Sequence, residues 1–221
     1  MIRALALTCL CIMLGACSRP AADVATTEPA RRVVTFAPNL AEIMFAVGAG
    51  DRLVGVSAWS DYPRAVLELP EIGDAFTIDQ EQLSLLQPDL LLVWESGMPA
   101  HTVDELRKQG YRVEAISTRN LDAVATAMIR VGELTGQQAS AAAAAQRFVA
   151  EVDALRTAYD DAEPIDDFFQ ISARPLYTIN REHFISEIVG LCGGRNIFAE
   201  LDGFAPSVSV EAVIDRNPEV M

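Results

Sequence analysis

The chain of 221 residues is long enough for one large domain or two small ones. Its 51% hydrophobic and 22% charged residues are typical of a globular protein and argue against disorder. The formal net charge of −14 would repel phosphate backbones, which argues against nucleic-acid binding. The only two histidines, His101 and His183, argue against a His-rich zinc site.

The first segment of the chain has the features of a secretory signal. A short basic start precedes an apolar run over residues 4–14, and a bilayer span would need about 20 apolar residues. The run leads into Leu-Gly-Ala-Cys at Cys17, which resembles the lipobox where bacterial lipoproteins are cleaved and lipidated. We predict a signal peptide over 1–16, lipidation of Cys17 and a polar tether over 17–31. The alternative is an ordinary signal peptide with a chance cysteine.

Cleavage there would leave Cys192 as the one cysteine of the folded part. A lone thiol in an oxidising compartment is unusual. We expect it either to be buried and inert or to have a partner that this chain lacks.

Strands and helices alternate after the tether, which is typical of the α/β class. Apolar runs predict strands near Val33–Phe36, Leu53–Val56, Leu90–Trp94, Arg112–Ile116 and Phe168–Ile171. Helices are expected from Asn39, from Asp79, near Ala100–Gln109 and near Leu121–Leu134. The continuous apolar run at Leu90 predicts a parallel sheet that is covered on both faces.

A long alanine-rich segment without Pro or Gly interrupts this alternation. Its larger apolar residues fall on one helical stripe, namely Phe148, Val152, Leu155 and Tyr159. We predict one long helix that joins two Rossmann-like lobes with parallel sheets. The predicted division is an N-terminal lobe over 32–136, an interlobe helix over 137–162 and a C-terminal lobe over 163–221.

The second lobe repeats part of the first. Residues 78–90 and 208–220 share capping, apolar and Pro-acid positions without a gap. In the first copy a strand and then about 45 residues to Leu134 follow, whereas the second copy stops as its apolar strand begins. We therefore expect the second lobe to be incomplete; a natural short form is the alternative.

Five aromatic residues fall in loops or at strand ends of both halves: Trp59, Phe76, Trp94, Tyr177 and Phe204. Ligands of doubly wound sheets bind beyond the carboxyl ends of the strands. The five together predict an aromatic cleft between the lobes for a large, flat, partly apolar ligand. For each one alone, packing at the edge of the core is the alternative.

Two glutamates occupy matching positions of the repeat. Glu81 and Glu211 each lie two residues after a capping residue, where a helix dipole favours a carboxylate. Their repetition also suits docking onto a two-fold symmetric partner with basic pockets.

The sequence contains no phosphate loop, Cys-x-x-Cys, His-Glu-x-x-His or Gly-x-Ser-x-Gly motif, so we predict no catalytic residues, resident cofactor or metal site.

Four stretches carry a resemblance to a known family: 32–39 (Arg-Val-Val-Thr-Phe-Ala-Pro-Asn), 54–63 (Val-Gly-Val-Ser-Ala-Trp-Ser-Asp-Tyr-Pro), 87–90 (Gln-Pro-Asp-Leu) and 192–198 (Cys-Gly-Gly-Arg-Asn-Ile-Phe). Residues 32–221 resemble periplasmic substrate-binding proteins of the helical-backbone class (class III). The resemblance is nearest to the cobalamin (vitamin B12) binding components of ABC importers. It implies capture of a corrinoid between two lobes and delivery to a permease dimer with its ATPase subunits, without chemistry on the ligand.

The resemblance also implies roles for single residues. Trp59, Trp94 and Tyr177 would face the corrin, and Asn39 would lie at the same cleft. Phe76 and Phe204 would substitute for tryptophans that the family's cobalamin binders carry at the neighbouring alanine positions. Glu81 and Glu211 would dock onto permease arginines, and Cys192 would pair with a cysteine near the C-terminus. The protein would be a periplasmic lipoprotein that meets the membrane only through its anchor.

Two alternatives remain open. The ligand could be haem, which wants a Tyr or His axial ligand, or a ferric siderophore, which wants cleft arginines such as Arg174 or Arg181. A chelatase-like or structural lipoprotein on the same fold would require a metal-reactive cluster, for example His183 with a carboxylate.

Overall fold

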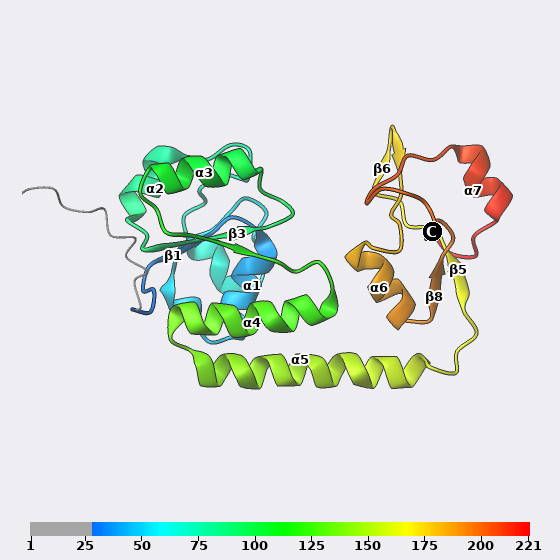
Figure 1. Ribbon diagram of the computed structural model, residues 1–221, viewed down its shortest axis with the longest axis horizontal. Helices are drawn as coiled ribbons and strands as arrows, with labels where there is room; N and C mark the ends of the chain where they lie inside the picture. Colours follow the sequence, from blue (N-terminus) through cyan, green and yellow to red (C-terminus); the bar gives the residue numbers. More distant parts are fainter. Residues whose placement is uncertain (1–27) are drawn as a thin grey trace, which may run out of the picture.

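The computed structural model describes residues 28–221, in which two α/β lobes are joined by one long helix (Figure 1). The predicted signal peptide, the lipidation site Cys17 and most of the predicted tether lie outside the described residues. In the described part, no helix has both the length and the apolar character needed to cross a membrane.

The N-terminal lobe is built on one parallel sheet of four strands in the order β2-β1-β3-β4. The strands are β1 (Val33–Thr35), β2 (Leu53–Gly55), β3 (Leu90–Trp94) and β4 (Val113–Ile116). The helices are α1 (Pro38–Ala46), α2 (Gln80–Leu86), α3 (Ala100–Lys108) and α4 (Leu121–Thr135), with short 3-10 turns at Gly50–Arg52 and Arg64–Glu68.

Strand β3 lies at the centre of this lobe and is buried on both faces. Leu90 and Leu92 pack with α1, α4 and the start of the long helix, whereas Leu91 and Val93 pack with α2 and α3. Successive side chains of a strand point to opposite faces, so a continuous apolar run serves two cores at once. The prediction of a sheet covered on both faces is confirmed.

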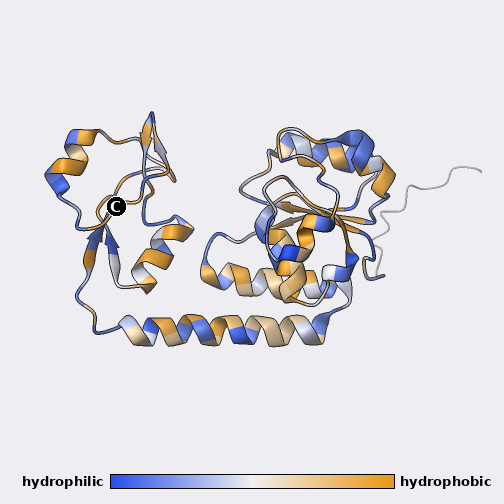
Figure 2. Cartoon of the chain, turned by 180° about the vertical axis from the view of Figure 1, so that it is seen from behind, coloured by the Kyte–Doolittle hydropathy of each residue, from blue (hydrophilic) through white to orange (hydrophobic). Residues whose placement is uncertain are grey.

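The long helix α5 (Gln138–Tyr159) leaves the first lobe along α4 (Figure 1). A Cβ on Gly132 of α4 would lie 2.2 Å from the Cβ of Ala141, so the glycine permits close packing of the two helices. The far half of α5 does not follow the predicted apolar stripe, since Leu155 and Tyr159 are both 44% exposed. Beyond the N-terminal lobe the helix has little to pack against, and Figure 2 shows hydrophobic and hydrophilic residues interspersed along it.

The C-terminal lobe has fewer and shorter strands. Its elements are β5 (Ile165–Asp167), β6 (Ser172–Ala173), β7 (Leu176–Tyr177), α6 (Phe184–Leu191), β8 (Gly194–Asn196) and α7 (Val210–Arg216). The strand predicted at Phe168–Ile171 is wrong, because the strand ends at Asp167 and Phe168 belongs to the core with Phe198. Two acidic residues in β5 concealed it from an apolar pattern.

The predicted internal repeat is visible in the sheet order. In the first lobe β1 lies between β2 and β3; in the second, β5 lies between β8 and Val220, which bridges Asp167 in parallel. Helices α2 and α7 both have seven residues, and the side chains of Asp79 and Ser209 cap them. Both helices end in a left-handed residue, namely Gln87 (φ 45°) and Asn217 (φ 46°).

Candidate interlobe binding cleft

A cavity of about 920 Å³ lies between the two lobes. Its N-terminal wall comes from the loops after all four strands and from helices α1, α4 and α5. Its C-terminal wall comes from the start of α6 and from Phe204. This volume is at the upper end of the range for small-molecule sites, about 300–1,000 Å³. The cleft can therefore take a large ligand.

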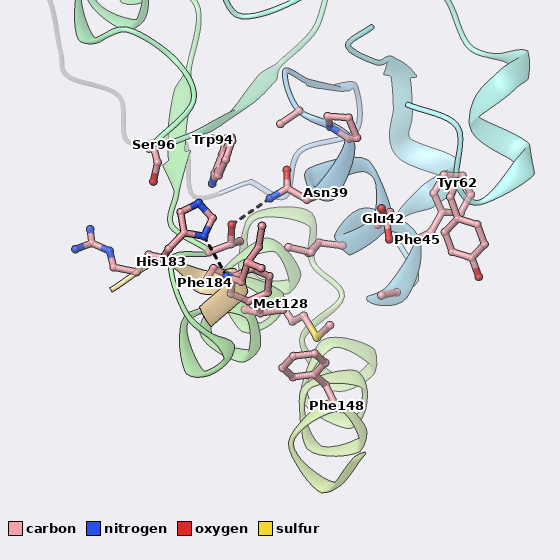
Figure 3. A pocket seen from close by; sticks show the side chains of 18 of the residues that line it. Asn39, Glu42, Phe45, Tyr62, Trp94, Ser96, Met128, Phe148, His183 and Phe184 are labelled. Atoms are coloured by element: carbon pink, nitrogen blue, oxygen red, sulfur yellow. Dashed lines mark hydrogen bonds between the residues drawn. The ribbon is translucent and has the colours of Figure 1, made fainter. Parts of the chain in front are cut away.

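The polar part of the N-terminal wall lies where the sheet changes direction. The chain continues from β1 outward to β2 and from β3 outward to β4, so the loops after these strands diverge and leave a crevice. Asn39 follows β1 and Thr118 follows β4, and Nδ2 of Asn39 donates to Oγ1 of Thr118 at 3.1 Å (Figure 3). This bond leaves the carbonyl oxygen of Asn39 as an acceptor at the crevice.

Trp94 ends β3 and lines the same crevice. A Cβ on Gly97 would come within 2.3 Å of the indole ring, so the glycine allows the ring to lie against the following loop. Arg119, the nearby cationic side chain, forms an ion pair with Glu95 at 2.9 Å, so its charge is balanced within the first lobe. Hydrogen bonds from Ser117 and then Arg119 hold the pKa of the Glu95 carboxyl below its usual range.

The floor of the cleft is apolar. Val124 and Met128 of α4 and Phe148 of α5 line it, together with Ile43 and Phe45 of α1 (Figure 3). These helices also carry the core of the N-terminal lobe, so the floor is a continuation of that core. An apolar ligand face could be buried there, while the exposed carboxylate of Glu42 lines the same cavity.

The C-terminal wall is organised by His183. Its Nδ1 accepts a hydrogen bond from the backbone N–H of Ile185 at 3.1 Å and so caps α6. A nitrogen that accepts a hydrogen bond carries no proton, so the neutral ring holds its proton on Nε2. The ring lies against Phe204, with 4.4 Å between centroids, and burial lowers the pKa of His183.

Three of the six ligand-binding residues predicted from the sequence line this cavity: Asn39, Trp94 and Phe204. The other three, Trp59, Phe76 and Tyr177, are not among its lining residues. Trp59 is 85% exposed in a turn with φ 68°, and Phe76 is 80% exposed where Asp74 Oδ1 accepts from its backbone N–H. The structure thus places the predicted aromatic residues partly in the cavity and partly outside it.

Sequence reasoning missed four lining residues to which it assigned no role in the site: Tyr62, Thr118, Met128 and Phe148. His183 also lines the cavity, and the sequence analysis named it only for the chelatase-like alternative. Tyr62 lies in the Ser-Asp-Tyr-Pro stretch, and Thr118 follows a strand as Asn39 does, so both had a usable signal. Met128 has the helical spacing of a core residue and is only 8% exposed, so its sequence position gave no sign that it also lines the cleft. His183 is brought to the cleft only by the packing of the second lobe.

The two predicted docking glutamates lie on separate lobes. Glu81 is in the first turn of α2 and Glu211 in the first turn of α7, and both side chains are exposed. Both helices lie on the side of the molecule away from α5 (Figure 1). Hydrogen bonds from its own backbone N–H and from Ser209 lower the pKa of Glu211, which keeps it charged.

Two further sequence expectations concern metal donors and the thiol. Among residues 28–221, no three His, Cys, Asp or Glu residues gather as a metal site. His101 lies at the exposed start of α3, away from His183. Cys192 is a free thiol and is exposed, so the alternative of a buried, inert cysteine is wrong.

Comparison with known proteins gives a consistent result. A vitamin B12-binding protein of Vibrio cholerae is 37% identical over 193 residues, which are 87% of this chain and 70% of the relative. One of Yersinia pestis is 34% identical over 194 residues, covering 88% and 69% of the two chains.

Solved structures extend the comparison to other ligands. The crystal structure of a periplasmic vitamin B12 binding protein of Vibrio cholerae matches with a TM-score of 0.79 and 36% identity, covering 87% of this chain and 76% of that one. A periplasmic heme binding protein of Pseudomonas aeruginosa matches with a TM-score of 0.76 and 27% identity, covering 86% and 71%. The family model described as "Periplasmic binding protein" matches residues 33–221. The two-lobed fold, its interlobe cleft and these matches agree: the chain belongs to the periplasmic binding protein family.

Proposed function

We propose that this protein captures cobalamin in its interlobe cleft and delivers it to the permease of an ABC importer. The observation that carries the proposal is the cavity of about 920 Å³, which aromatic and apolar side chains from both lobes line. The relatives named vitamin B12-binding proteins support the choice of ligand.

The lining suits a corrin ring with polar substituents. Trp94, Phe148 and Phe204 offer aromatic or apolar surface to the ring faces. The carbonyl of Asn39, Ser96 and the Nε2–H of His183 offer hydrogen bonds at the margin. Such a site binds and releases its ligand without making or breaking a covalent bond, so we propose no catalytic residue and no resident cofactor.

The three predicted aromatic residues outside the cavity would act at its rim. Trp59, Phe76 and Tyr177 would meet parts of the ligand that extend beyond the cleft. A non-glycine residue with φ 68° stores backbone strain, and strained residues cluster at functional sites. Trp59 is therefore the strongest of the three, and Trp59→Ala should weaken binding.

Haem is the second candidate, since His183 and Tyr62 both line the cleft and a heme binding protein is similar. An axial ligand must offer a lone pair. While His183 caps α6 through Nδ1, its Nε2 carries the proton and offers none. Haem binding would therefore depend on Tyr62, and Tyr62→Phe would abolish it while leaving cobalamin binding intact.

A ferric siderophore fits the cleft less well. Siderophore anions call for free cations, and Arg119 in the cleft is paired with Glu95. The two candidates from the sequence, Arg174 and Arg181, do not line the cavity. Arg181 donates from Nε to the backbone oxygen of Ala199 instead.

Delivery would use the two exposed glutamates. Glu81 and Glu211 would form ion pairs with arginines on the two halves of a permease dimer that works with ATPase subunits. Cys17 would carry the lipid, residues 17–31 would tether the lobes in the periplasm, and the anchor would be the only membrane contact. A rigid interlobe helix would keep closure small, so the transporter would open the lobes to release the ligand.

The first experiment is calorimetric titration of the lipid-free protein with cyanocobalamin, haem and a ferric siderophore. Tight one-to-one binding of cyanocobalamin alone is expected. Binding of haem or the siderophore instead would keep the transport role and overturn the ligand. Silence from all three would favour a chelatase-like or structural lipoprotein on the same fold.

Docking is tested separately from binding. The double substitution E81A/E211A should abolish cobalamin uptake in cells and leave cyanocobalamin affinity unchanged. A matched control replaces two exposed carboxylates on the α5 side of the molecule, Glu151 and Glu163. Normal uptake by the E81A/E211A protein would rule out the docking role.

A further inference from the structure

The two lobes touch through one polar contact. The backbone N–H of Leu121 donates to Oε2 of Glu187 at 2.8 Å. Among the described residues, it is the only hydrogen bond or ion pair that joins residues 33–136 to residues 163–221.

The contact satisfies a helix end of the first lobe with a side chain of the second. Leu121 is the first residue of α4, and the N–H groups of a first turn have no partner within their helix. Asn120 caps the N–H of Ala123 at 2.7 Å, and Glu187 takes that of Leu121. The carboxylate also lies at the positive end of the α4 dipole, which adds charge–dipole attraction.

The contact stands between two hollows. On one side is the binding cleft; on the other is a second cavity of about 350 Å³, and both Leu121 and Glu187 line that second cavity. Figure 1 shows the start of α4 next to α6 across the gap between the lobes. The side chain of Leu121 is buried, with 6% of its surface exposed, so apolar packing accompanies the hydrogen bond on the α4 side.

Both partners lie next to residues that form the cleft walls. Thr118 and Arg119, just before α4, line the cleft on one side. His183, Phe184 and Ile185, at the start of α6, line it on the other. The hydrogen bond therefore joins the two segments that carry the facing walls of the cleft.

The internal repeat supplies a comparison. Glu42 in α1 of the first lobe occupies the sequence position that Glu187 has in α6, within the shared Glu-Ile pattern. Glu42 lines the cleft and has no hydrogen-bond partner among the described residues. The bond of Glu187 is thus no requirement of the repeated helix, but a feature of the interface between the lobes.

We infer that Glu187 is a positioning residue of the cleft: its carboxylate fastens α6 to the start of α4 and fixes the interlobe width that the ligand meets. Opening the cleft during release requires this bond to break. The inference does not depend on which ligand the cleft takes.

The direct test is hydrogen exchange of the Leu121 amide, followed by NMR in the ligand-free protein. E187A should speed exchange at Leu121 and leave the amides in the middle of α4 unchanged. E187Q keeps an oxygen acceptor and should restore most of the protection. E182A removes an exposed carboxylate just before α6 and serves as the matched control. Wild-type exchange at Leu121 in E187A would overturn the inference.

A second variant removes the donor instead of the acceptor. L121P removes the N–H at the first position of a helix, where proline is well tolerated. It also replaces the buried side chain of Leu121, so L121A, which keeps the N–H, is its control. The preceding Asn120 is extended (φ −152°, ψ 172°), as a residue before proline prefers. This variant tests the contact even if E187A folds poorly.

The two variants together form a cycle on ligand dissociation. E187A and L121P should each speed release of bound cyanocobalamin roughly threefold to tenfold. E187A should add nothing to the rate of L121P, whereas it should still speed release when it is combined with L121A, which keeps the bond. If the fold-changes in dissociation rate of the single variants multiplied in the E187A/L121P double variant, the inference would be wrong. If cyanocobalamin does not bind, the exchange test still decides the role of Glu187, so failure of the proposed ligand and failure of this inference are distinct.

Discussion

The two lobes repeat one plan but bury different amounts of apolar side chain. In the N-terminal lobe two clusters of buried residues meet on opposite faces of β3. In the C-terminal lobe the buried cluster is small, with Phe168, Phe198 and Val213 as its fully packed members, and α6 has no buried residue. Within the described residues, the two lobes thus share a topology while the second buries fewer apolar side chains.

The repeat extends to single hydrogen bonds at the sheet. Asp89 accepts from the backbone N–H of Arg32 at 3.0 Å, and Glu219 accepts from that of Asp166 at 3.2 Å. The next residue in the first lobe is the buried Val33 of the core. In the second lobe it is Asp167, whose buried Oδ1 has no partner among the described residues. One position thus stabilises the first lobe and weakens the second.

The largest effect is expected from matched cavities in α2 and α7. Leu83 and Val213 occupy the same position of the repeat, with 0% and 8% of their surface exposed. Leu83→Ala should lower the free energy of unfolding by about 2–5 kcal/mol, and Val213→Ala by about 2 kcal/mol. Urea unfolding measures both losses in free energy, and hydrogen exchange shows which lobe is destabilised. Equal losses would remove the contrast between the lobes.

The two lobes should also contribute unequally to ligand affinity, with the larger share from the first lobe. Trp94 packs on the rigid sheet of the first lobe, whereas Phe204 lies in a loop of the second and is 50% exposed. Trp94→Ala should weaken cyanocobalamin binding about 10- to 100-fold, and Phe204→Ala less. Calorimetry ranks the two. A larger effect of Phe204→Ala would assign the main contact to the second lobe.

The helix caps should behave alike in both lobes. Asp79 accepts from Gln82 N–H at 2.9 Å, and Ser209 accepts from Ala212 N–H at 3.2 Å. Asp79→Ala and Ser209→Ala should each cost about 1 kcal/mol of stability. Thermal unfolding checks this. A negligible loss for Ser209→Ala alone would show that the repeat is weaker in α7 than its geometry indicates.

The smallest effect is a pH dependence that belongs to the second lobe. Burial raises the pKa of Asp167, so the folded state binds its proton more tightly than the unfolded state does. Its contribution is fully favourable below the unfolded pKa and is lost as pH rises through the folded pKa. Asp167→Asn should remove this loss and stabilise the lobe at neutral pH by about 1 kcal/mol. The free energy of unfolding of the wild type and the variant, measured from pH 3 to pH 7, tests this prediction. Asp166 and Glu219 are the neighbouring carboxylates, and both proteins retain them. If the free energy of unfolding of the variant changed with pH as steeply as that of the wild type, the prediction would be wrong.

The sequence determined the elements whose signals are local. The apolar run at Leu90, the caps at Asp79 and Ser209, and the Pro- and Gly-free segment that became α5 each depend on nearby residues. The repeat could also be predicted, because it requires only that two stretches share a pattern. The Asp-rich strand β5 was misplaced, since its burial comes from neighbours distant in sequence.

Only the tertiary structure decided which residues share the cleft. Trp94 and Asn39 meet because adjacent parallel strands end at one edge, a rule that sequence can anticipate. The cap that His183 makes on α6, the place of Met128 in the cleft and the bond between Glu187 and Leu121 could not be anticipated. Their roles depend on how far apart α5 holds the two lobes and how α6 is turned toward α4. That distance and angle come from the packing of whole helices, and no local pattern in the chain records them.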